Sequence, residues 1–401
     1  MQRHLTTDFL VIGAGIIGLG VARSLRRRFP GSSITLIEKE SAPGMHASGR
    51  NSGVLHAGFY YTADSLKARF TREGNARMQA FCRTHGIAVN TCGKVVVARD
   101  ANELETLFEL QKRAQTNGVE AYLIDEDELR RIEPNARTFS RALYSPTTAT
   151  VDPKAVVAAL AKDVSNEGVK LVFGTGFLRR VSPHTVETNR GTIDAGVVIN
   201  CAGLYADRVA RAFGFGRDYT IVPFKGIYLT YDGDVPPVRT NVYPVPKLSN
   251  PFLGVHYTVT ADGTVKIGPT AIPAFWRENY RGFSRFNAAE TAEILRWEAE
   301  LFLKNRFSFR TLAFEEFRKY DKSYLQSLAR GMVRNADVSY FRTWSTPGIR
   351  AQLLHRRTLE LVQDFIVEGD ADSVHVLNAV SPAFTCSFPF ADWIVERYLS
   401  S

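Results

Sequence analysis

Three glycines near the N-terminus, Gly13, Gly15 and Gly18, have the G-x-G-x-x-G spacing that suits a dinucleotide. Gly13 permits a tight turn, Gly15 lets the backbone approach a pyrophosphate, and Gly18 allows a helix to pack closely on a strand. Glu38 follows 20 residues after the last glycine, where its carboxylate can bind both hydroxyls of a ribose. The spacing therefore indicates nucleotide binding, with the pyrophosphate at the start of a helix.

The elements around these glycines have the order that the motif requires. Residues 8–12 are expected to form a buried strand, residues 19–25 a helix and residues 34–37 a second strand. A further buried strand is expected over 196–200, ending in the small residues Cys201, Ala202 and Gly203 before another helix. The chain thus returns to the nucleotide-binding sheet after a long excursion.

The segment after Glu38 favours FAD over NAD. A nicotinamide-binding domain would usually continue into a helix, but residues 41–53 are rich in Pro, Gly and Ser, which disfavour a helix interior. A loop of this composition presents backbone N–H groups and short polar side chains to a long, flat cofactor. A flexible surface loop is the alternative interpretation.

Taken together, several segments resemble the D-amino-acid-oxidase-type FAD oxidoreductases, and among them the L-2-hydroxyglutarate oxidase/dehydrogenase branch. The resemblance spans nearly the whole chain, and its motifs occur in order. It rests on the N-terminal glycine motif and on residues 48–61, 151–153, 200–203, 252–257, 266–269, 348–352 and 375–383.

The resemblance implies that the chain binds FAD, which we expect to be non-covalent. A covalent flavin link through Cys386 is the alternative, although a buried free thiol is the favoured state. The residues expected to bind the cofactor are Gly13, Gly15, Ile17, Gly18, Glu38, Lys39, Ser48, Arg50, Asn51, Ser52, Gly53, Phe177, Ala202, Gly203, Ser381, Pro382, Ala383, Phe384 and Thr385.

The same resemblance carries two histidines, His256 and His56, to positions near the active site. Oxidation of a 2-hydroxy acid needs a base for the hydroxyl proton and a cation for the carboxylate. An imidazole of near-neutral pKa is the usual acceptor, and His256 is favoured over His56. The residues expected to bind substrate are Arg350, Lys225, Tyr60 and Tyr243.

We therefore expect FAD-dependent oxidation of L-2-hydroxyglutarate, or a close 2-hydroxy acid, to the 2-oxo acid by hydride transfer to flavin. An amino-acid or amine oxidase of the same fold is one alternative, and a non-catalytic FAD-binding protein is another. The electron acceptor stays open among oxygen, a quinone and a carrier protein.

The composition of the 401-residue chain limits where the protein is expected to act and which partners it is expected to bind. No apolar run approaches the 20 residues of a membrane-spanning helix, and no leader is expected because the first strand begins near residue 8. The four cysteines have neither metal-ligand nor disulfide spacing, so a reduced cytoplasmic setting without a metal is expected. The net charge of +9 has no nucleic-acid-binding pattern. Residues 275–320 are aromatic and basic; a packed helical segment is favoured, with peripheral contact at the inner face of a membrane as the alternative.

The expected fold class is α/β, with a Rossmann-type FAD-binding domain interleaved with an antiparallel-sheet α+β substrate domain. The FAD-binding domain is expected to comprise residues 1–85, 140–218 and 345–401. The substrate domain is expected to comprise residues 86–139 and 219–344. Helices are expected over 65–86, 102–116, 153–167, 287–305 and 389–398, and strands over 93–98, 219–231, 253–260 and 264–267.

Overall fold

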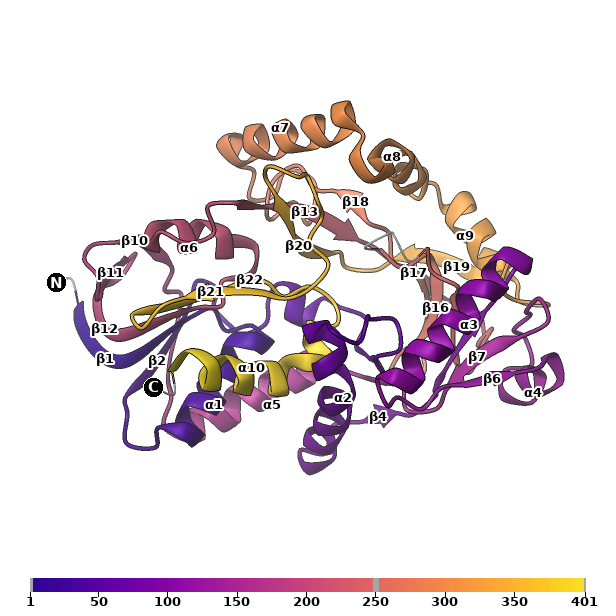
Figure 1. The fold of residues 1–401 in the computed structure, drawn as a ribbon, viewed down its shortest axis with the longest axis horizontal. Helices are drawn as coiled ribbons and strands as arrows, with labels where there is room; N and C mark the ends of the chain where they lie inside the picture. The colour runs from indigo at the N-terminus through magenta and orange to yellow at the C-terminus, as the bar shows by residue number, and fades with distance from the viewer. Residues whose placement is uncertain (1–2, 248–251, 400–401) are drawn as a thin grey trace. The chain divides into compact units, whose positions relative to one another are not determined.

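The computed structural model describes residues 3–247 and 252–399, which divide into two compact units (Figure 1). Unit 1 comprises Met1–Arg50, Pro153–Pro223 and Arg350–Ser401. Unit 2 comprises Asn51–Asp152 and Phe224–Ile349. Each unit is assembled from separate stretches of the chain, as the expected interleaving requires.

Unit 1 is built on a sheet with the strand order β10-β11-β12-β1-β2-β9, in which β22 also pairs with β12 and β21 pairs with β22. Its strands are β1 (Arg3–Ile12), β2 (Ile34–Glu38), β9 (Lys170–Phe173), β10 (Phe177–Arg180), β11 (Thr185–Thr188), β12 (Gly191–Asn200), β21 (Ile366–Gly369) and β22 (Ser373–Asn378). The central strands β9, β2, β1, β12 and β22 run parallel, and the register aligns Ile12 with both Ile37 and Asn200. The carboxyl ends of β1, β2 and β12 therefore lie side by side.

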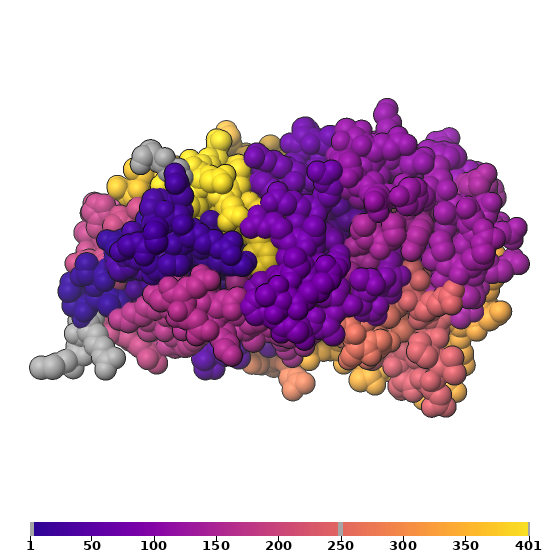
Figure 2. Space-filling model, turned by 90° about the horizontal axis from the view of Figure 1, so that it is seen from below, coloured from indigo at the N-terminus to yellow at the C-terminus, as the bar shows by residue number. Residues whose placement is uncertain are grey.

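Helices complete unit 1. They are α1 (Ile16–Arg28), α5 (Pro153–Asn166), α6 (Ala206–Phe213) and α10 (Ala383–Leu399), with the short turns η1 (Ala47–Gly49) and η2 (Gly203–Tyr205). Helix α1 packs against both α5 and α10, and the three lie side by side on the surface shown in Figure 2. The absence of a side chain at Gly20 lets α1 and α10 pack closely. A Cβ at this position would lie only 3.2 Å from the Ala391 Cβ.

Unit 2 is built on an eight-stranded sheet with the order β19-β14-β17-β16-β15-β5-β7-β6. Its strands are β5 (Lys94–Val97), β6 (Tyr122–Ile124), β7 (Ala142–Ser145), β14 (Leu229–Tyr231), β15 (Asn241–Pro244), β16 (His256–Val259), β17 (Val265–Gly268) and β19 (Phe341–Trp344). All neighbours in this sheet are antiparallel except β15 and β5. A smaller sheet has the order β3-β8-β4, with β3 (Val54–Leu55), β4 (Val89–Asn90) and β8 (Ala149–Val151).

Side-chain alternation gives the large sheet two different faces. On one face, Val95, Val242 and Tyr257 pack with Leu325 and Ala329 of helix α9 (Lys322–Arg330). On the other face, Val96 and Tyr243 pack with residues of helix α3 (Ala101–Thr116) and with Phe59 and Tyr60. Both faces are therefore covered over the central strands, and the polar side chains of β5, β15 and β16 are buried.

The remaining helices of unit 2 are α2 (Leu66–Thr84), α4 (Glu126–Ile132), α7 (Ala288–Lys304) and α8 (Phe309–Arg318), with η3 (Arg306–Ser308) and η4 (Val338–Tyr340). Three further strands are β13 (Tyr219–Gly226), β18 (Ile272–Pro273) and β20 (Gly348–His355). Strands β13 and β20 each cross a unit boundary, and β18 pairs with Phe224 and Lys225 of β13. Among the described helices, none combines the length and apolarity needed to cross a bilayer.

Two sequence-based predictions of elements are wrong. The single strand expected over 219–231 is two strands, β13 and β14, because the backbone N–H groups of Ile227 and Tyr228 leave the ladder for the hydroxyls of Thr270 and Ser345. The last helix begins at Ala383 rather than at Pro389, which lies inside α10. Proline lacks a backbone N–H, so it is tolerated in the first turn of a helix and disfavoured in the interior. A helix start at Pro389 was therefore the expectation from the sequence.

The predicted domain boundaries stay a prediction, and the compact units differ from them at four segments. Residues 219–223 belong to unit 1 and residues 345–349 to unit 2. Residues 51–85 and 140–152 belong to unit 2. The pairing of β3 with β8, Val54 opposite Thr150 and Leu55 opposite Ala149, joins these two segments.

Candidate functional site

The glycine turn of unit 1 is shaped to expose backbone at the start of α1. Gly13 has a φ of 106°, and a Cβ there would lie 2.6 Å from the Cys201 carbonyl oxygen. A Cβ at Gly18 would lie 1.9 Å from the Gly13 carbonyl oxygen, so only glycine fits where the helix folds back on the turn. Gly15 caps α1 without a side-chain hydrogen bond, and the first turn holds no acidic residue. The positive end of the helix is therefore available to an anionic diphosphate.

Glu38, at the carboxyl end of β2, ties this turn to the sheet. It is 8% exposed, and its two carboxylate oxygens accept the backbone N–H groups of Ala14 (2.8 Å) and Glu40 (2.9 Å). A carboxylate oxygen can accept more than one hydrogen bond, so each retains capacity for a ribose hydroxyl. The geometry fits the nucleotide half of FAD.

Loop residues 41–50 pack onto the same turn. The Ser48 hydroxyl accepts the Ile16 N–H at 2.9 Å, and the Gly44 N–H donates to the Ala14 carbonyl at 3.0 Å. Arg50 donates from Nε to the Met45 carbonyl at 2.7 Å, which holds the loop closed. The flexible-loop alternative is thus disfavoured, because the segment makes specific contacts with the motif.

Further predicted cofactor residues of unit 1 lie at four places. Lys39 is paired with Glu40 at 2.6 Å. Ala202 and Gly203 follow β12, where the Ala202 N–H donates to Asn200 Oδ1 at 3.1 Å. Phe177 begins β10, and its ring lies 6.1 Å from that of Phe213. Ile17 is buried in the first turn of α1.

The predicted C-terminal cofactor residues lie at the start of α10. Ser381 and Pro382 precede the helix, while Ala383, Phe384 and Thr385 form its first turn. The Cys386 N–H donates to the Pro382 carbonyl at 3.1 Å, and Cys386 is a fully buried free thiol. A helix of 17 residues starting here directs its positive end toward residues 381–385, which suits negative charge on a bound group.

The three remaining cofactor candidates, Asn51, Ser52 and Gly53, begin unit 2. Asn51 Oδ1 accepts the Gly53 N–H at 2.9 Å, and the Gly53 carbonyl accepts the Val151 N–H at 3.0 Å. These bonds fix the segment that leads into β3.

His256, the first residue of β16, is 3% exposed. Its Nδ1 lies 2.8 Å from the Gly254 carbonyl oxygen, and because a carbonyl can only accept, Nδ1 carries the hydrogen. Nε2 then holds the lone pair that can accept a proton. Burial lowers the pKa of His256 to about 3, so the near-neutral pKa expected from the sequence is wrong.

Tyr243 stacks on His256, and the same tyrosine ring contacts a buried cation, Lys94, that sequence reasoning missed. The ring centroids of Tyr243 and His256 lie 3.7 Å apart with 16° between the planes. Lys94 Nζ lies 4.0 Å from the Tyr243 centroid and 5.3 Å from that of Tyr60. The alternation of Lys94, Val96 and Ala98 within the predicted strand 93–98 was the available sign that Lys94 faces inward.

The predicted cations lie on separate strands. Lys225 of β13 donates to Asn279 Oδ1 at 3.1 Å, and partial burial lowers its pKa. Asn279 is a neutral partner, so the lysine charge stays available to a carboxylate. Arg350 lies on the part of β20 that belongs to unit 1.

His56 follows β3 and is 7% exposed. Its backbone carbonyl accepts a hydrogen bond from Asn75 Nδ2 at 3.1 Å, and the same amide donates to the Leu55 carbonyl at 2.9 Å. Asn75 of α2 therefore fixes the segment that carries His56.

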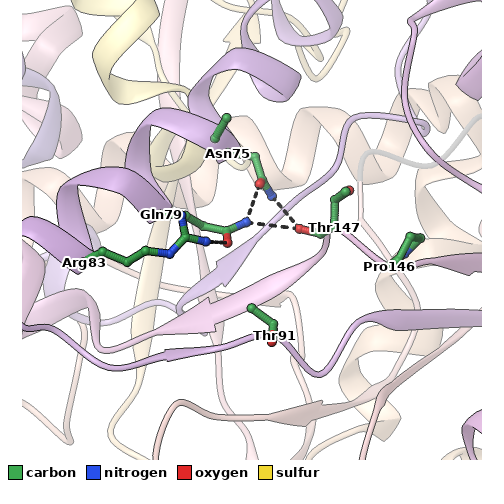
Figure 3. A pocket seen from close by; sticks show the side chains of 7 residues that line it. Asn75, Gln79, Arg83, Thr91, Pro146 and Thr147 are labelled. Carbon is green, nitrogen blue, oxygen red and sulfur yellow. Dashed lines mark hydrogen bonds between the residues drawn. The ribbon is translucent and has the colours of Figure 1, made fainter.

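A cavity of about 280 Å³ opens beside this anchor (Figure 3). A chain of side-chain bonds crosses it, from Arg83 to Gln79 at 2.9 Å and from Gln79 to Asn75 at 2.7 Å. The described residues that line it, Asn75, Ala76, Gln79, Arg83, Thr91, Pro146 and Thr147, include none of the predicted site residues. The three side chains bond to one another, and Asn75 at the end of this series also fixes the segment that carries His56.

Comparisons with known proteins agree with this geometry. Residues 8–397 match the model of a family described as FAD dependent oxidoreductase. The chain is 36% identical over 396 residues to L-2-hydroxyglutarate dehydrogenase of Escherichia coli (strain K12), covering 97% of this chain and 92% of that protein. It is also 36% identical to the mitochondrial L-2-hydroxyglutarate dehydrogenase of Mus musculus, covering 96% of this chain and 87% of the relative.

Solved structures share the fold at lower identity. Dithionite-reduced L-alpha-glycerophosphate oxidase from Mycoplasma pneumoniae, with FAD bound, has a TM-score of 0.75 at 21% identity, covering 98% of this chain and 94% of that one. Glycine oxidase from Geobacillus kaustophilus has a TM-score of 0.70 at 19% identity, covering 98% and 95%.

The buried Glu38 carboxylate generates a prediction about cofactor retention. Glu38→Gln removes the negative charge while keeping the shape, so the Kd for FAD should rise about tenfold or more, as expected when a buried charged acceptor is lost. Fluorescence titration of apoprotein with FAD measures the change. Glu167→Gln, an exposed acid just after α5, is the matched control and should leave the Kd unchanged. Equal affinities for Glu38→Gln and the parent would contradict the ribose assignment.

Proposed function

The chain belongs to the FAD dependent oxidoreductase family, and we propose that it oxidises L-2-hydroxyglutarate to the corresponding 2-oxo acid. The observation that carries the proposal is His256, a buried imidazole whose hydrogen on Nδ1 is held by the Gly254 carbonyl. The relatives named L-2-hydroxyglutarate dehydrogenase, aligned over nearly the whole chain, support this choice of substrate.

Oxidation of a 2-hydroxy acid removes the C2 hydrogen with its electron pair and the hydroxyl hydrogen as a proton. When FAD is bound, its flavin accepts the hydride. His256 Nε2 accepts the hydroxyl proton, because the hydrogen bond from Nδ1 to Gly254 orients the ring and leaves Nε2 as the acceptor. His56, held through its backbone by Asn75, is the second histidine assigned to the site.

Two cations are assigned to the substrate carboxylates. Lys225 has a neutral amide partner, so a carboxylate beside it gains a charge-assisted hydrogen bond. Arg350 can bind a carboxylate through two parallel N–H groups. Tyr243 and Tyr60 belong to the same buried cluster as His256 and are assigned to the walls of the substrate site.

A panel of substrates tests the reaction. L-2-hydroxyglutarate should bleach the flavin under anaerobic conditions faster than L-lactate or any amino acid, because a cation is assigned to each of its two carboxylates. Stopped-flow absorbance of the FAD-loaded protein measures the rates. Equal or faster bleaching by an amino acid would move the protein to the amine-oxidising members of the fold, and no bleaching by any substrate would contradict an enzymatic role.

His256→Ala should lower the flavin reduction rate by about 100-fold or more, since a positioned general base typically contributes a factor of this size. The substrate Kd should change much less.

Because the pKa of His256 lies at about 3, the base stays neutral at and above pH 5, and the parent rate should show no loss from its protonation between pH 5 and 8. His56→Ala is the comparison variant. If His56→Ala abolishes reduction while His256→Ala does not, the base has been assigned to the wrong histidine.

We also propose that the protein contacts an anionic membrane surface through an aromatic surface on residues 283–317. The exposed apolar residues of this range include Phe283 and Phe286 before α7, and Leu303, Phe307, Phe314 and Phe317 at the end of α7 and on η3 and α8. The segment is helical and belongs to unit 2 with Trp297 and Phe309 buried, as the favoured expectation has it, but Phe283 is 84% exposed and Phe307 70% exposed. A monomer seldom leaves so many large apolar side chains in water unless they bind something.

The basic residues near the aromatic surface favour an anionic lipid bilayer as the partner that covers it. Arg281, Lys304, Arg306 and Arg318 are exposed between the aromatic residues, which suits lipid headgroups above an apolar layer. The aromatic surface lies on α7, η3, α8 and the segment before α7, all within unit 2. An enzyme held at a bilayer reaches lipid-soluble acceptors, so among oxygen, a quinone and a carrier protein we propose a quinone.

Vesicle binding tests this surface. The FAD-loaded protein should sediment with vesicles of phosphatidylglycerol and phosphatidylcholine, and the triple variant Phe307→Ser, Phe314→Ser, Phe317→Ser should bind about tenfold or more weakly, because three apolar anchors are lost. The control is Phe108→Ser, Phe139→Ser, which changes exposed phenylalanines elsewhere in unit 2. Equal binding by the triple variant and the parent, or no binding by the parent, would contradict membrane contact. Vesicle-independent dimers that the triple variant loses would assign the surface to a second copy instead.

A further inference from the structure

Lys94 is a fully buried amine without a carboxylate partner. Its exposed fraction is 0%, and its Nζ has no hydrogen-bond partner among the described residues. The aromatic rings of Tyr243, Tyr60 and Phe59 surround the nitrogen at 4.0, 5.3 and 5.9 Å. Burying an unpaired cation is costly, so a residue kept in this position needs a functional account.

Strand register connects Lys94 to His256. In the parallel pairing of β5 with β15, Lys94 aligns with Asn241, and Tyr243 lies two residues further on the same face. In the antiparallel pairing of β15 with β16, Val242 aligns with Tyr257, which places Tyr243 opposite His256. Because the imidazole occupies one face of the Tyr243 ring at 3.7 Å, an ammonium 4.0 Å from the ring centre must lie on the other face.

We propose that Lys94 is a positioning residue that acts through the Tyr243 ring, disfavouring protonation of His256 so that the imidazole remains a proton acceptor when a dicarboxylate binds. The inference rests on the proposed function, because it takes His256 as the base. A substrate with two carboxylates brings negative charge to the site, which would favour an imidazolium before reaction. A fixed positive charge behind the ring opposes that change.

The other groups around His256 do not replace this charge. Tyr60 and Tyr243 are phenols and Cys92 is a thiol, and burial raises the pKa of each, so these groups are neutral near pH 7. Lys319 also lowers the pKa of His256, but it is paired with Glu316, which offsets its charge. Lys266 lies on the neighbouring strand β17, opposite Thr258. Burial lowers the pKa of Lys94 to about 7, so its charge is retained on the acid side of neutrality.

The sign of the expected effect follows from charge repulsion. While Lys94 is cationic, it lowers the pKa of His256, and removing it raises that pKa. Lys94→Met keeps the length of the side chain and removes the charge, so the pKa of His256 should rise by about 1 pH unit or more. Below the new pKa the base is protonated, so the acid limb of the reduction rate at saturating substrate should move to higher pH.

Two measurements on the FAD-loaded protein test the proposal. Histidine-selective NMR titration of substrate-free protein, with the His256 signal assigned from His256→Asn, reports the pKa directly. Stopped-flow reduction by saturating L-2-hydroxyglutarate, extended below pH 5 to about pH 4, reports the acid limb, which the variant should show at a pH where the parent, with a His256 pKa of about 3, still shows little loss. Lys319→Met is the matched control and should shift both readouts much less, because its partner Glu316 already offsets the charge.

The outcomes separate the alternatives. An unchanged His256 pKa in folded Lys94→Met would overturn the proposal, as would equal shifts in Lys94→Met and Lys319→Met. A large rise in substrate Kd with no shift of either pH readout would also overturn it and assign Lys94 to direct carboxylate binding. If the parent is not reduced by the hydroxy acid, the proposed function fails, while the NMR titration still decides whether Lys94 sets the pKa of His256. Lys94→Leu is the second variant should methionine not fold, and its thermal midpoint should match or exceed that of the parent because an unpaired buried amine is removed.

Discussion

Side-chain alternation along the large sheet of unit 2 is the constraint on which the candidate chemistry depends. Each strand must place successive side chains on opposite faces. On β16 this puts Tyr257 into the apolar core with α9 and leaves His256 on the other face, against Tyr243. On β5 the same rule puts Val95 into the apolar core and Lys94 under the aromatic rings. The same strand register therefore buries the apolar core on one face of the sheet and positions His256, the proposed base, on the other face.

In unit 1 the corresponding constraint is that backbone N–H groups must be exposed while the turn that carries them stays rigid. The carboxyl ends of β1, β2 and β12 meet at one edge, and the glycine turn, Glu38 and the 201–203 segment all follow those ends. Glu38 joins the turn to β2 through the Ala14 N–H, and Ser48 joins the loop to α1. The start of α1 is held by hydrogen bonds from two segments, β2 and the 41–50 loop, and this preorganisation lowers the cost of binding a cofactor there.

Much of this could be predicted from the sequence, because the determining features were local. The glycine spacing, Glu38 and the short strands fix the nucleotide turn within 40 residues, and the family match and the FAD cofactor agree with the prediction. The features that were missed depend on tertiary context. Pro389 lies inside α10 because burial of Phe388, Phe390 and Ala391 holds the helix around it, which outweighs a local propensity. The pKa of His256 and the burial of Lys94 follow from strand pairings far apart in sequence.

The aromatic surface and the Lys94 cage follow the same physical rule in opposite settings. Apolar rings left in water and an amine removed from water are both costly alone, so each implies a group that offsets the cost. For the exposed phenylalanines of residues 283–317 we propose that this group is a lipid bilayer. For Lys94 it lies within the protein, since the rings of Tyr243, Tyr60 and Phe59 stabilise the ammonium in part through their faces. Because that compensation is incomplete, the lysine readily gives up its proton near neutral pH, and its influence on His256 depends on the proton occupancy of a group that need not touch the substrate.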